Sequence, residues 1–361
     1  MEYYIGLDVS QRQTAICIVN GKGTRVAEGK ALTEPPGIYA WITKHVDPKV
    51  ITKVGLEAGA MSAWLYTELS KLGLPMLCLE AYQAAEFLKA QRNKTDRNDA
   101  RGLAQMVRMG GDFIKPVIIR SQCSQEARAL LTMRQFLVHQ KVGLENNITG
   151  TLKPFGLITA RGNISTKVFR ERVLATLDRA DERGILVRET VMPSLDLYDT
   201  LCKQLAVLSK KVEGIAKSDP VCRRLMTAPG VGPIVALSFV TAVDNPKRFA
   251  DTNDIGAYFG LTPRQYQSGE IDIRGSTSRR GDVMTRYHLV QAATVLLFNT
   301  KKWCALKAWG MKIAKRHGFS KARIAVARKL AIILCKMWLR EEDFCWTNIP
   351  ASPVLAGATP A

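Results

Sequence analysis

Apolar residues in the first part of the chain follow strand-like and helix-like spacings in a definite order. Three strand patterns come first, and the third alternates apolar and polar residues as a half-exposed edge strand does. A helix opening at Pro35-Pro36 follows, and then strand, helix, strand and two further helices. Ordinary doubly wound sheets do not begin with three consecutive strands. The predicted strands occupy about 3–9, 14–19, 24–32, 51–57 and 75–80.

This order is typical of the RNase-H-like fold, so we predict an α/β RNase-H-like domain over residues 1–120. Residues 121–218 lack strand patterns and carry long helical patterns, which predict two antiparallel helices forming a coiled-coil spacer or dimerisation arm. Residues 219–345 are predicted to be mainly helical, with one polar strand-like segment at 264–274. The small residues at 346–361 predict a disordered tail.

A Pro-Gly-Val-Gly turn joins two predicted helices in the stretch LMTAPGVGPIVALSFVTAV. In a helix-hairpin-helix motif, glycines such as Gly230 and Gly232 let backbone N–H groups approach a DNA phosphate. Tight packing between two helices requires the same glycines. The sequence alone does not favour either interpretation.

Charge is unevenly distributed, and the total is +20. Residues 261–340 contain 17 Lys and Arg and three acids, whereas residues 1–110 contain 14 basic and 11 acidic residues. Clustered cations displace counterions from phosphates, so a nucleic acid is favoured over a generally basic surface. We expect a catalytic N-terminal part and a C-terminal part that lies against nucleic acid. Its candidate contact residues include Lys321, Arg323, Arg328, Lys329 and Lys336.

Other site classes are disfavoured. The eight cysteines form no CxxC pair and only four histidines are present, so we expect no structural zinc site. The chain begins with a strand pattern and not a signal peptide. Its longest apolar runs, near 231–243 and 324–339, are too short or too charged to span a bilayer. We therefore expect a cytoplasmic protein without membrane contact.

Four acidic residues are placed to hold divalent cations. Asp8 lies on the buried first strand and Glu57 closes the strand at 51–57, which puts both at one edge of an RNase-H-like sheet. Asp96 and Asp99 share one face at the start of a helix, although Asp96 could instead cap that helix. Four carboxylates that converge without lysine partners repel one another, and their oxygens suit Mg²⁺ or Mn²⁺. Two such ions can clamp a phosphodiester during in-line displacement.

The segment RGSTSRRG at 274–281 combines hydroxyls, cations and flanking glycines. Arg279 and Arg280 suit bidentate phosphate binding. A serine is a poor nucleophile unless its proton is removed or its target is activated. The residues alone therefore favour a phosphate-binding loop over a nucleophilic serine. The candidate nucleic-acid contacts are Gly230, Gly232, Arg274, Ser276, Arg279 and Arg280.

Taken together, these motifs resemble a known family. IGLDVS, GLEAG around Glu57 and KTDRNDA at 94–100 are similar to the signature of the DEDD-type insertion-sequence transposases of the IS110 family. TAPGVGPIVA, YFGLTP and GSTSRRGD resemble the C-terminal transposase domain of that family. The resemblance runs from about residue 3 to about residue 300 and includes the helical arm.

The resemblance implies a RuvC-like catalytic domain, a coiled-coil arm and a C-terminal domain with a nucleophilic serine. Its pattern puts the nucleophile on Ser278, with Ser276 in reserve, and implies a transient phosphoserine link to DNA followed by religation without net hydrolysis. The implied partners are donor and target double-stranded DNA, a structured non-coding guide RNA, and further copies of the chain. We expect a homodimer that assembles into a tetramer.

Two alternatives remain open. A structure-selective endonuclease of the Holliday-junction-resolvase type would use the same acids with water as its nucleophile, and would not need Ser278. A non-catalytic nucleic-acid-binding protein on an RNase-H-like scaffold is disfavoured because all four acids are present.

Overall fold

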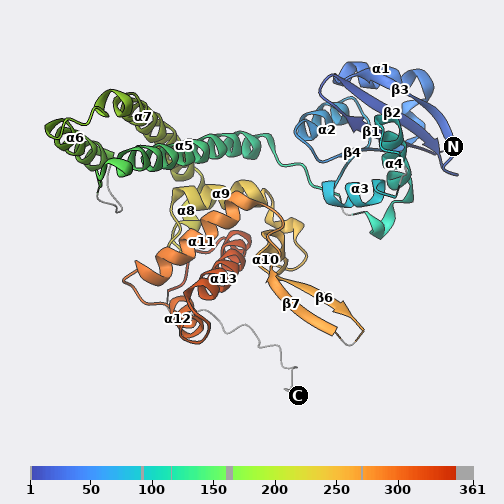
Figure 1. The fold of residues 1–361 in the computed structure, drawn as a ribbon. Helices are drawn as coiled ribbons and strands as arrows, with labels where there is room; N and C mark the ends of the chain where they lie inside the picture. The colour runs from blue at the N-terminus through green and yellow to red at the C-terminus, as the bar shows by residue number, and fades with distance from the viewer. Residues whose placement is uncertain (1, 91–92, 115, 160–165, 270, 347–361) are drawn as a thin grey trace. The chain divides into compact units, whose positions relative to one another are not determined.

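A computed structural model describes residues 2–90, 93–114, 116–159, 166–269 and 271–346. The chain divides into two compact units, Met1–Arg120 and Ser121–Ala361, here called unit 1 and unit 2 (Figure 1). Among the described residues, no helix is both long enough and apolar enough to cross a membrane.

The described residues of unit 1 form one five-stranded sheet in the order β3-β2-β1-β4-β5. Strands β1 and β2 pair antiparallel, as do β2 and β3, whereas β1 with β4 and β4 with β5 are parallel. The structure thus confirms a mixed α/β sheet at the N-terminus. The strands are β1 (Tyr3–Val9), β2 (Gln13–Asn20), β3 (Arg25–Leu32), β4 (Ile51–Glu57) and β5 (Met76–Leu79).

Helices cover both faces of this sheet. Ile5 and Leu7 on β1 pack into one core with residues of α1 and α2, and α4 packs on the opposite face against β1, β2 and β4. The alternation of side chains along a strand produces this division, because successive residues of β1 point to opposite faces. The helices of unit 1 are α1 (Pro35–His45), α2 (Ser62–Lys71), α3 (Ala81–Leu88) and α4 (Asp96–Met109), with 3-10 turns at Pro48–Val50 and Gly111–Phe113.

Unit 2 begins with a helical arm. Helices α5 (Gln122–Leu152) and α7 (Arg188–Ser218) lie side by side (Figure 1). The sequence analysis predicts two helices here, but the described residues contain a further one, α6 (Thr166–Glu182), which packs against α7. A 3-10 turn (Lys153–Phe155) follows α5. Supercoiling of the arm helices remains a prediction.

The rest of unit 2 is mainly helical, as predicted. Buried apolar residues from α9, α11 and α13 form its core, among them Phe239, Leu289 and Leu330. The segment predicted as a single strand is a β-hairpin, which turns at Gly269 with φ +57°. The elements are α8 (Pro220–Leu225), α9 (Pro233–Val243), a 3-10 turn (Pro246–Arg248), α10 (Asp254–Tyr258), β6 (Pro263–Ser268), β7 (Ile271–Thr277), α11 (Val283–Phe298), α12 (Ala305–His317) and α13 (Phe319–Arg340).

Only the first residue of the predicted tail is described. The ring of Trp346 lies 5.4 Å from that of Phe344, and the Lys302 ammonium lies 4.4 Å from the Trp346 ring centre. Trp346 therefore packs on unit 2. Residues 347–361 lie outside the described residues.

Candidate active site

Strands β1 and β4 each carry a glycine two positions before a candidate acid. Gly6 pairs with Gly55 in the parallel register, so Asp8 and Glu57 follow at equivalent positions on the same face. A Cβ atom at Gly6 would lie 2.2 Å from the Ala100 carbonyl oxygen of α4. At Gly55 it would lie 2.1 Å from a Val107 methyl group. The two glycines let α4 approach the sheet closely, on the face that carries both acids.

Asp8 lies in an electrostatic environment that opposes its ionisation. Burial raises the pKa of Asp8, and the charges of Asp99, Asp96 and Glu57 raise it further, to about 6. Lys94 acts in the opposite direction. The fold therefore brings the four sequence-predicted acids near enough to interact through their charges.

Glu57 shares part of this environment. Its pKa is raised by burial, and the charges of Asp99 and Glu80 add to that effect, while Lys94 lowers it. Glu80 accepts a hydrogen bond from the Gln83 backbone N–H and caps α3, so it has a structural role beside the site.

Asp96 has a lysine partner, which corrects the expectation of four carboxylates without one. Lys30 on β3 donates to Asp96 at 2.7 Å and holds the pKa of Asp96 below its usual range. The two residues are 66 positions apart, so no local pattern predicts this pair. Asp96 does not cap α4 either, because Thr95 is the N-cap and accepts from the Asn98 N–H.

Asp99 lies one turn into α4 and is 8% exposed. Glu28 on β3, which the sequence analysis did not single out, holds the same turn of the helix in place. Its carboxylate pairs with Arg97 and with Arg101, the latter at 3.1 Å, and its side chain is only 14% exposed. The spacing of these arginines, four apart on one helix face, is the signal that could have revealed a shared partner.

The donor set fits a hard divalent cation by its chemistry, because it consists of carboxylate oxygens. Within the described residues, no three acidic, histidine or cysteine side chains lie close enough together to hold a metal ion. The four carboxylates thus interact through their charges, but in this structure they are not close enough together to coordinate one ion jointly. A metal that used Asp96 would have to displace Lys30 from it.

Ser278 lies in a loop that backbone hydrogen bonds hold against residues 260–262. The Ser278 N–H donates to the Thr262 carbonyl at 2.8 Å, and the Arg279 N–H donates to the Gly260 carbonyl at 3.2 Å. Cβ atoms at Gly260 and Gly281 would lie about 2 Å from backbone oxygens of the opposing segment, at 2.1 and 1.9 Å. Residues 258–262 and 278–281 are therefore in direct backbone contact, which fixes the half-buried Ser278.

Two of the candidate hydroxyls differ in their surroundings. Ser276, near the end of β7, lines a cavity of about 1050 Å³ together with Thr277 and Arg279. Ser278 is not among the described residues that line it. Helix α13 also lines the cavity and contributes Lys321, Arg328, Lys329, Lys336 and Arg340.

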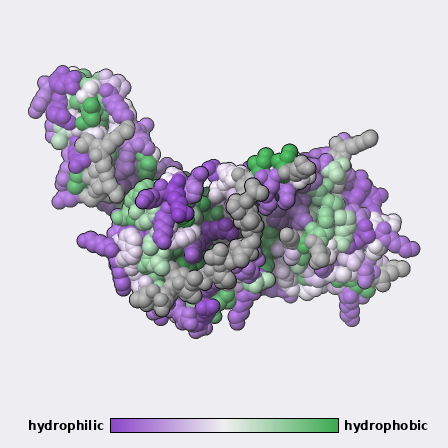
Figure 2. Space-filling model, turned by 90° about the horizontal axis from the view of Figure 1, so that it is seen from below, coloured by the Kyte–Doolittle hydropathy of each residue, from purple (hydrophilic) through white to green (hydrophobic). Residues whose placement is uncertain are grey.

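The cavity combines cations with an aromatic surface. The Lys329 ammonium lies 4.6 Å from the ring centre of Trp309. Glu342 and Asp343 add the acids of the lining. Figure 2 shows hydrophilic side chains over much of the face that it draws. This excess of cations suits a polyanion.

The remaining candidate nucleic-acid contacts, two glycines and two arginines, have different surroundings. A Cβ at Gly230 would lie 2.3 Å from the Ala292 carbonyl oxygen of α11, so tight packing accounts for this glycine. Gly232 has open space around its Cβ position and precedes α9. Arg274 is on β7, but its side chain lies outside the described residues. Arg280 is exposed, and its carbonyl accepts from Arg286 at 2.9 Å.

Two family models match this chain. A model of DEDD transposases of the IS110 type matches residues 5–156, which contain the four acids. A model described as the transposase IS116/IS110/IS902 family matches residues 222–308, which contain Ser276 and Ser278.

Known transposases are similar over most of their length. The transposase for insertion sequence element IS1111A of Coxiella burnetii is 29% identical over 309 residues, which are 83% of this chain and 82% of that protein. The transposase for insertion sequence element IS1328 of Yersinia enterocolitica is 28% identical over 282 residues, or 78% of this chain and 81% of that protein. The chain belongs to the IS110 family of insertion-sequence transposases, enzymes that cut and rejoin DNA.

Proposed function

We propose that this transposase is a site-specific recombinase that cuts and rejoins DNA with metal ions held by an acidic tetrad of unit 1 and with Ser278 of unit 2 as the nucleophile. Asp8, Glu57, Asp96 and Asp99 would hold Mg²⁺ or Mn²⁺. The observation that carries the proposal is the environment of Asp8, whose pKa is raised to about 6 by burial and by the three other carboxylates. Such an arrangement is unfavourable without a compensating cation and is typical of functional sites.

Divalent ions bound there would neutralise the developing charge on the scissile phosphate. Asp8 and Glu57, fixed on adjacent strands, supply the rigid half of the ligand set. Asp96 and Asp99 come from the first turns of α4. Asp96 is exposed and forms an ion pair with Lys30. On binding a metal ion, Asp96 would have to exchange Lys30 for the metal.

Ser278 supplies the nucleophile in this proposal. Its Oγ attacks the phosphorus while the bond to the leaving sugar oxygen breaks; the hydroxyl proton is lost and the leaving oxygen gains one. The reverse attack by a sugar hydroxyl of the second duplex restores the serine, so no phosphodiester is hydrolysed. Exposed Arg279 and Arg280 would hold the phosphate. The fixed backbone of the loop supports this role, because a positioned nucleophile avoids an orientational cost.

The partners in the proposal are donor and target DNA and a structured non-coding RNA. The cations that line the cavity beside β7 support binding of phosphate backbones. Base pairing to the RNA would select the DNA sequences, and protein contacts would hold the duplexes. Rejoining two cut duplexes needs four strand breaks, so we propose a dimer that assembles into a tetramer, with the helical arm as dimerisation element.

A recombination assay with donor DNA, target DNA and RNA transcribed from the DNA beside the gene tests the proposal. Ser278→Ala and Asp8→Asn should each abolish joined product, while Ser276→Ala, two positions earlier on β7, should retain it. A Ser278→Ala protein that still cuts DNA and leaves free ends would instead identify a resolvase-type endonuclease that uses water. Activity in the Asp8→Asn protein at the wild-type level would exclude the acidic tetrad from catalysis.

A further inference from the structure

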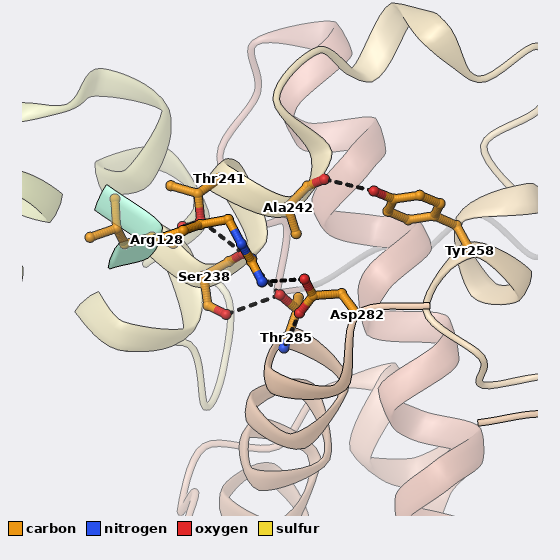
Figure 3. A network of polar contacts seen from close by, with 8 residues as sticks. Arg128, Ser238, Thr241, Ala242, Tyr258, Asp282 and Thr285 are labelled. Carbon is orange, nitrogen blue, oxygen red and sulfur yellow. Dashed lines mark hydrogen bonds and ion pairs between the residues drawn. The ribbon is translucent and has the colours of Figure 1, made fainter. Parts of the chain in front are cut away.

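The first turns of α5 are tied to the loop that carries Ser278. Arg128, in the second turn of α5, forms an ion pair with Asp282, the residue just before α11 (Figure 3). The two side chains are 17% and 7% exposed and are 154 positions apart in sequence. The pair therefore joins the first turns of α5 to the C-terminal part of unit 2 through a largely buried ion pair.

Asp282 carries two functions at once. One carboxylate oxygen accepts from the Thr285 backbone N–H at 2.8 Å and caps α11, while the other faces Arg128. Thr285 in turn donates to the Ser238 carbonyl of α9 at 3.1 Å (Figure 3). The position of Asp282 is thus set jointly by α11, α9 and the arm.

Only three residues separate Asp282 from Ser278, and they have little freedom. The Ser278 N–H is bound to Thr262, and Arg286 donates to the carbonyls of Phe259 and Arg280 at 3.0 and 2.9 Å. Because these hydrogen bonds restrain residues 278–281, the backbone there has little freedom to compensate for a displacement of Asp282. Such a displacement would move the serine.

The arm helix is anchored a second time, at its N-cap residue Ser121. The Ser121 N–H and Oγ both donate to the Asp244 carboxylate at the end of α9, at 3.0 and 2.5 Å. Helix α5 is 31 residues long in all, a length of about 46 Å at the usual helical rise. A single helix therefore connects the arm with the serine loop.

A buried ion pair is weak as a stabilising device, because desolvation offsets much of its attraction. An alternative role is to define a position. We propose that Arg128 is a positioning residue: through Asp282 it sets the placement of Ser278 and couples that placement to the arm. This inference rests on the proposed role of Ser278 as nucleophile.

The test compares full-length variants in the rate of covalent protein–DNA linkage at saturating DNA. Arg128→Met removes the cation, keeps a long side chain and leaves Asp282 free to cap α11. Asp282→Asn keeps an oxygen for the Thr285 N–H and removes the charge. Each should lower the rate about tenfold or more, since a 1 Å misplacement costs on the order of 100-fold. The Kd for DNA should stay within about twofold, because neither residue is proposed to touch DNA.

Three further measurements separate positioning from general damage. The double variant should be no slower than the single variants, as expected for two residues that act through each other. Arg128→Lys should recover part of the rate, since it restores a cation facing Asp282. Arg134→Met is the matched control, because Arg134 lies on the same helix and donates to Ser209 of α7 at 3.0 Å instead of pairing with Asp282. It should react like the wild type.

An unchanged rate in Arg128→Met, or additive losses in the double variant, would overturn the inference. If Arg128→Met is too unstable to assay, Asp282→Asn and Arg128→Lys decide the question by the same criteria. Ser278→Ala is the control for the underlying function. If it still forms the covalent link, the proposed nucleophile is wrong, whereas its inactivity beside an unaffected Arg128→Met refutes only the positioning role.

Discussion

Gly6 of β1 lies so close to Ala100 of α4 that a Cβ atom at position 6 would stand 2.2 Å from the Ala100 carbonyl oxygen. This approach is what brings the first turns of α4, with Asp96 and Asp99, over the end of β1, where Asp8 lies. The close packing of α4 on β1 is therefore what brings the acids of the site together.

Gly6→Ala should therefore destabilise unit 1 and disrupt the site. Overpacking against backbone cannot be relieved by a rotamer change, and we expect a loss of about 3 kcal/mol. Gly37→Ala is the control, because a Cβ there would meet only the Leu32 carbonyl at 3.6 Å, an ordinary contact. Urea unfolding of both proteins measures the difference. Equal stabilities would show that α4 does not need this approach.

Asp8→Asn should raise the stability of the metal-free protein at pH 7. The folded-state pKa of Asp8 is about 6 against a usual value of 3.8, so the folded protein holds this proton more tightly than the unfolded chain. Stability from Asp8 is thus fully present below about pH 4 and is lost as the pH rises through 6. Thermal unfolding in EDTA should give the variant the higher Tm at pH 7 and the same Tm near pH 3. A lower Tm at pH 7 would contradict the environment described for Asp8.

Binding of Mn²⁺ should become tighter as the pH rises from 5 through the raised pKa of Asp8, and should level off about one unit above that pKa. A metal must displace the proton that Asp8 retains below its raised pKa. Isothermal titration calorimetry at several pH values, with buffers of different ionisation enthalpy, measures both affinity and proton release. Affinity that is flat across this range, or release of no protons at pH 5, would remove Asp8 from the ligand set.

Lys30→Met should strengthen metal binding several-fold, because Lys30 competes for Asp96. Both partners are about half exposed, so little change in Tm is expected. Lys71→Met is the matched control, since Lys71 forms an ion pair with Glu68 on α2. Its Mn²⁺ affinity should equal that of the wild type. Weaker binding in Lys30→Met would mean that Lys30 supports the metal site instead of competing with it.

Lys321→Met, on the wall of the large cavity, should weaken nucleic-acid binding and lower its salt dependence. Loss of one phosphate contact reduces the slope of log K against log salt by about 1. Lys312 is exposed on α12 and does not line the cavity among the described residues, which makes Lys312→Met the comparison. Fluorescence anisotropy at several salt concentrations provides the slopes. Identical slopes in the two variants would show that the cavity does not contact the phosphates.

Local periodicity is enough to predict most elements of this chain. The strands of unit 1 are short apolar or alternating runs between turn residues, and α1 and α11 begin and end where the pattern changes. Helix α6 escaped prediction because it is polar along much of its length. The β6–β7 turn was not predicted, because Gly269 is the one turn signal in a run of otherwise strand-like polar residues.

The candidate site is predictable only in part. The acids could be picked out because each stands at the end of a strand or the start of a helix. Their restraints could not, because Lys30–Asp96 and Arg128–Asp282 join residues 66 and 154 positions apart. Pairing over such distances depends on tertiary packing, which periodicity does not encode.

The residue that becomes joined to DNA decides between a serine recombinase and a resolvase-type endonuclease. Incubating the full-length protein with Mg²⁺, guide RNA and a target DNA nicked to trap the intermediate should yield a protein–DNA adduct. Peptide mass spectrometry after nuclease digestion should then find a nucleotide phosphate on Ser278 and not on Ser276. Cleaved DNA with free 5′ and 3′ ends and an unmodified Ser278 peptide would contradict the account.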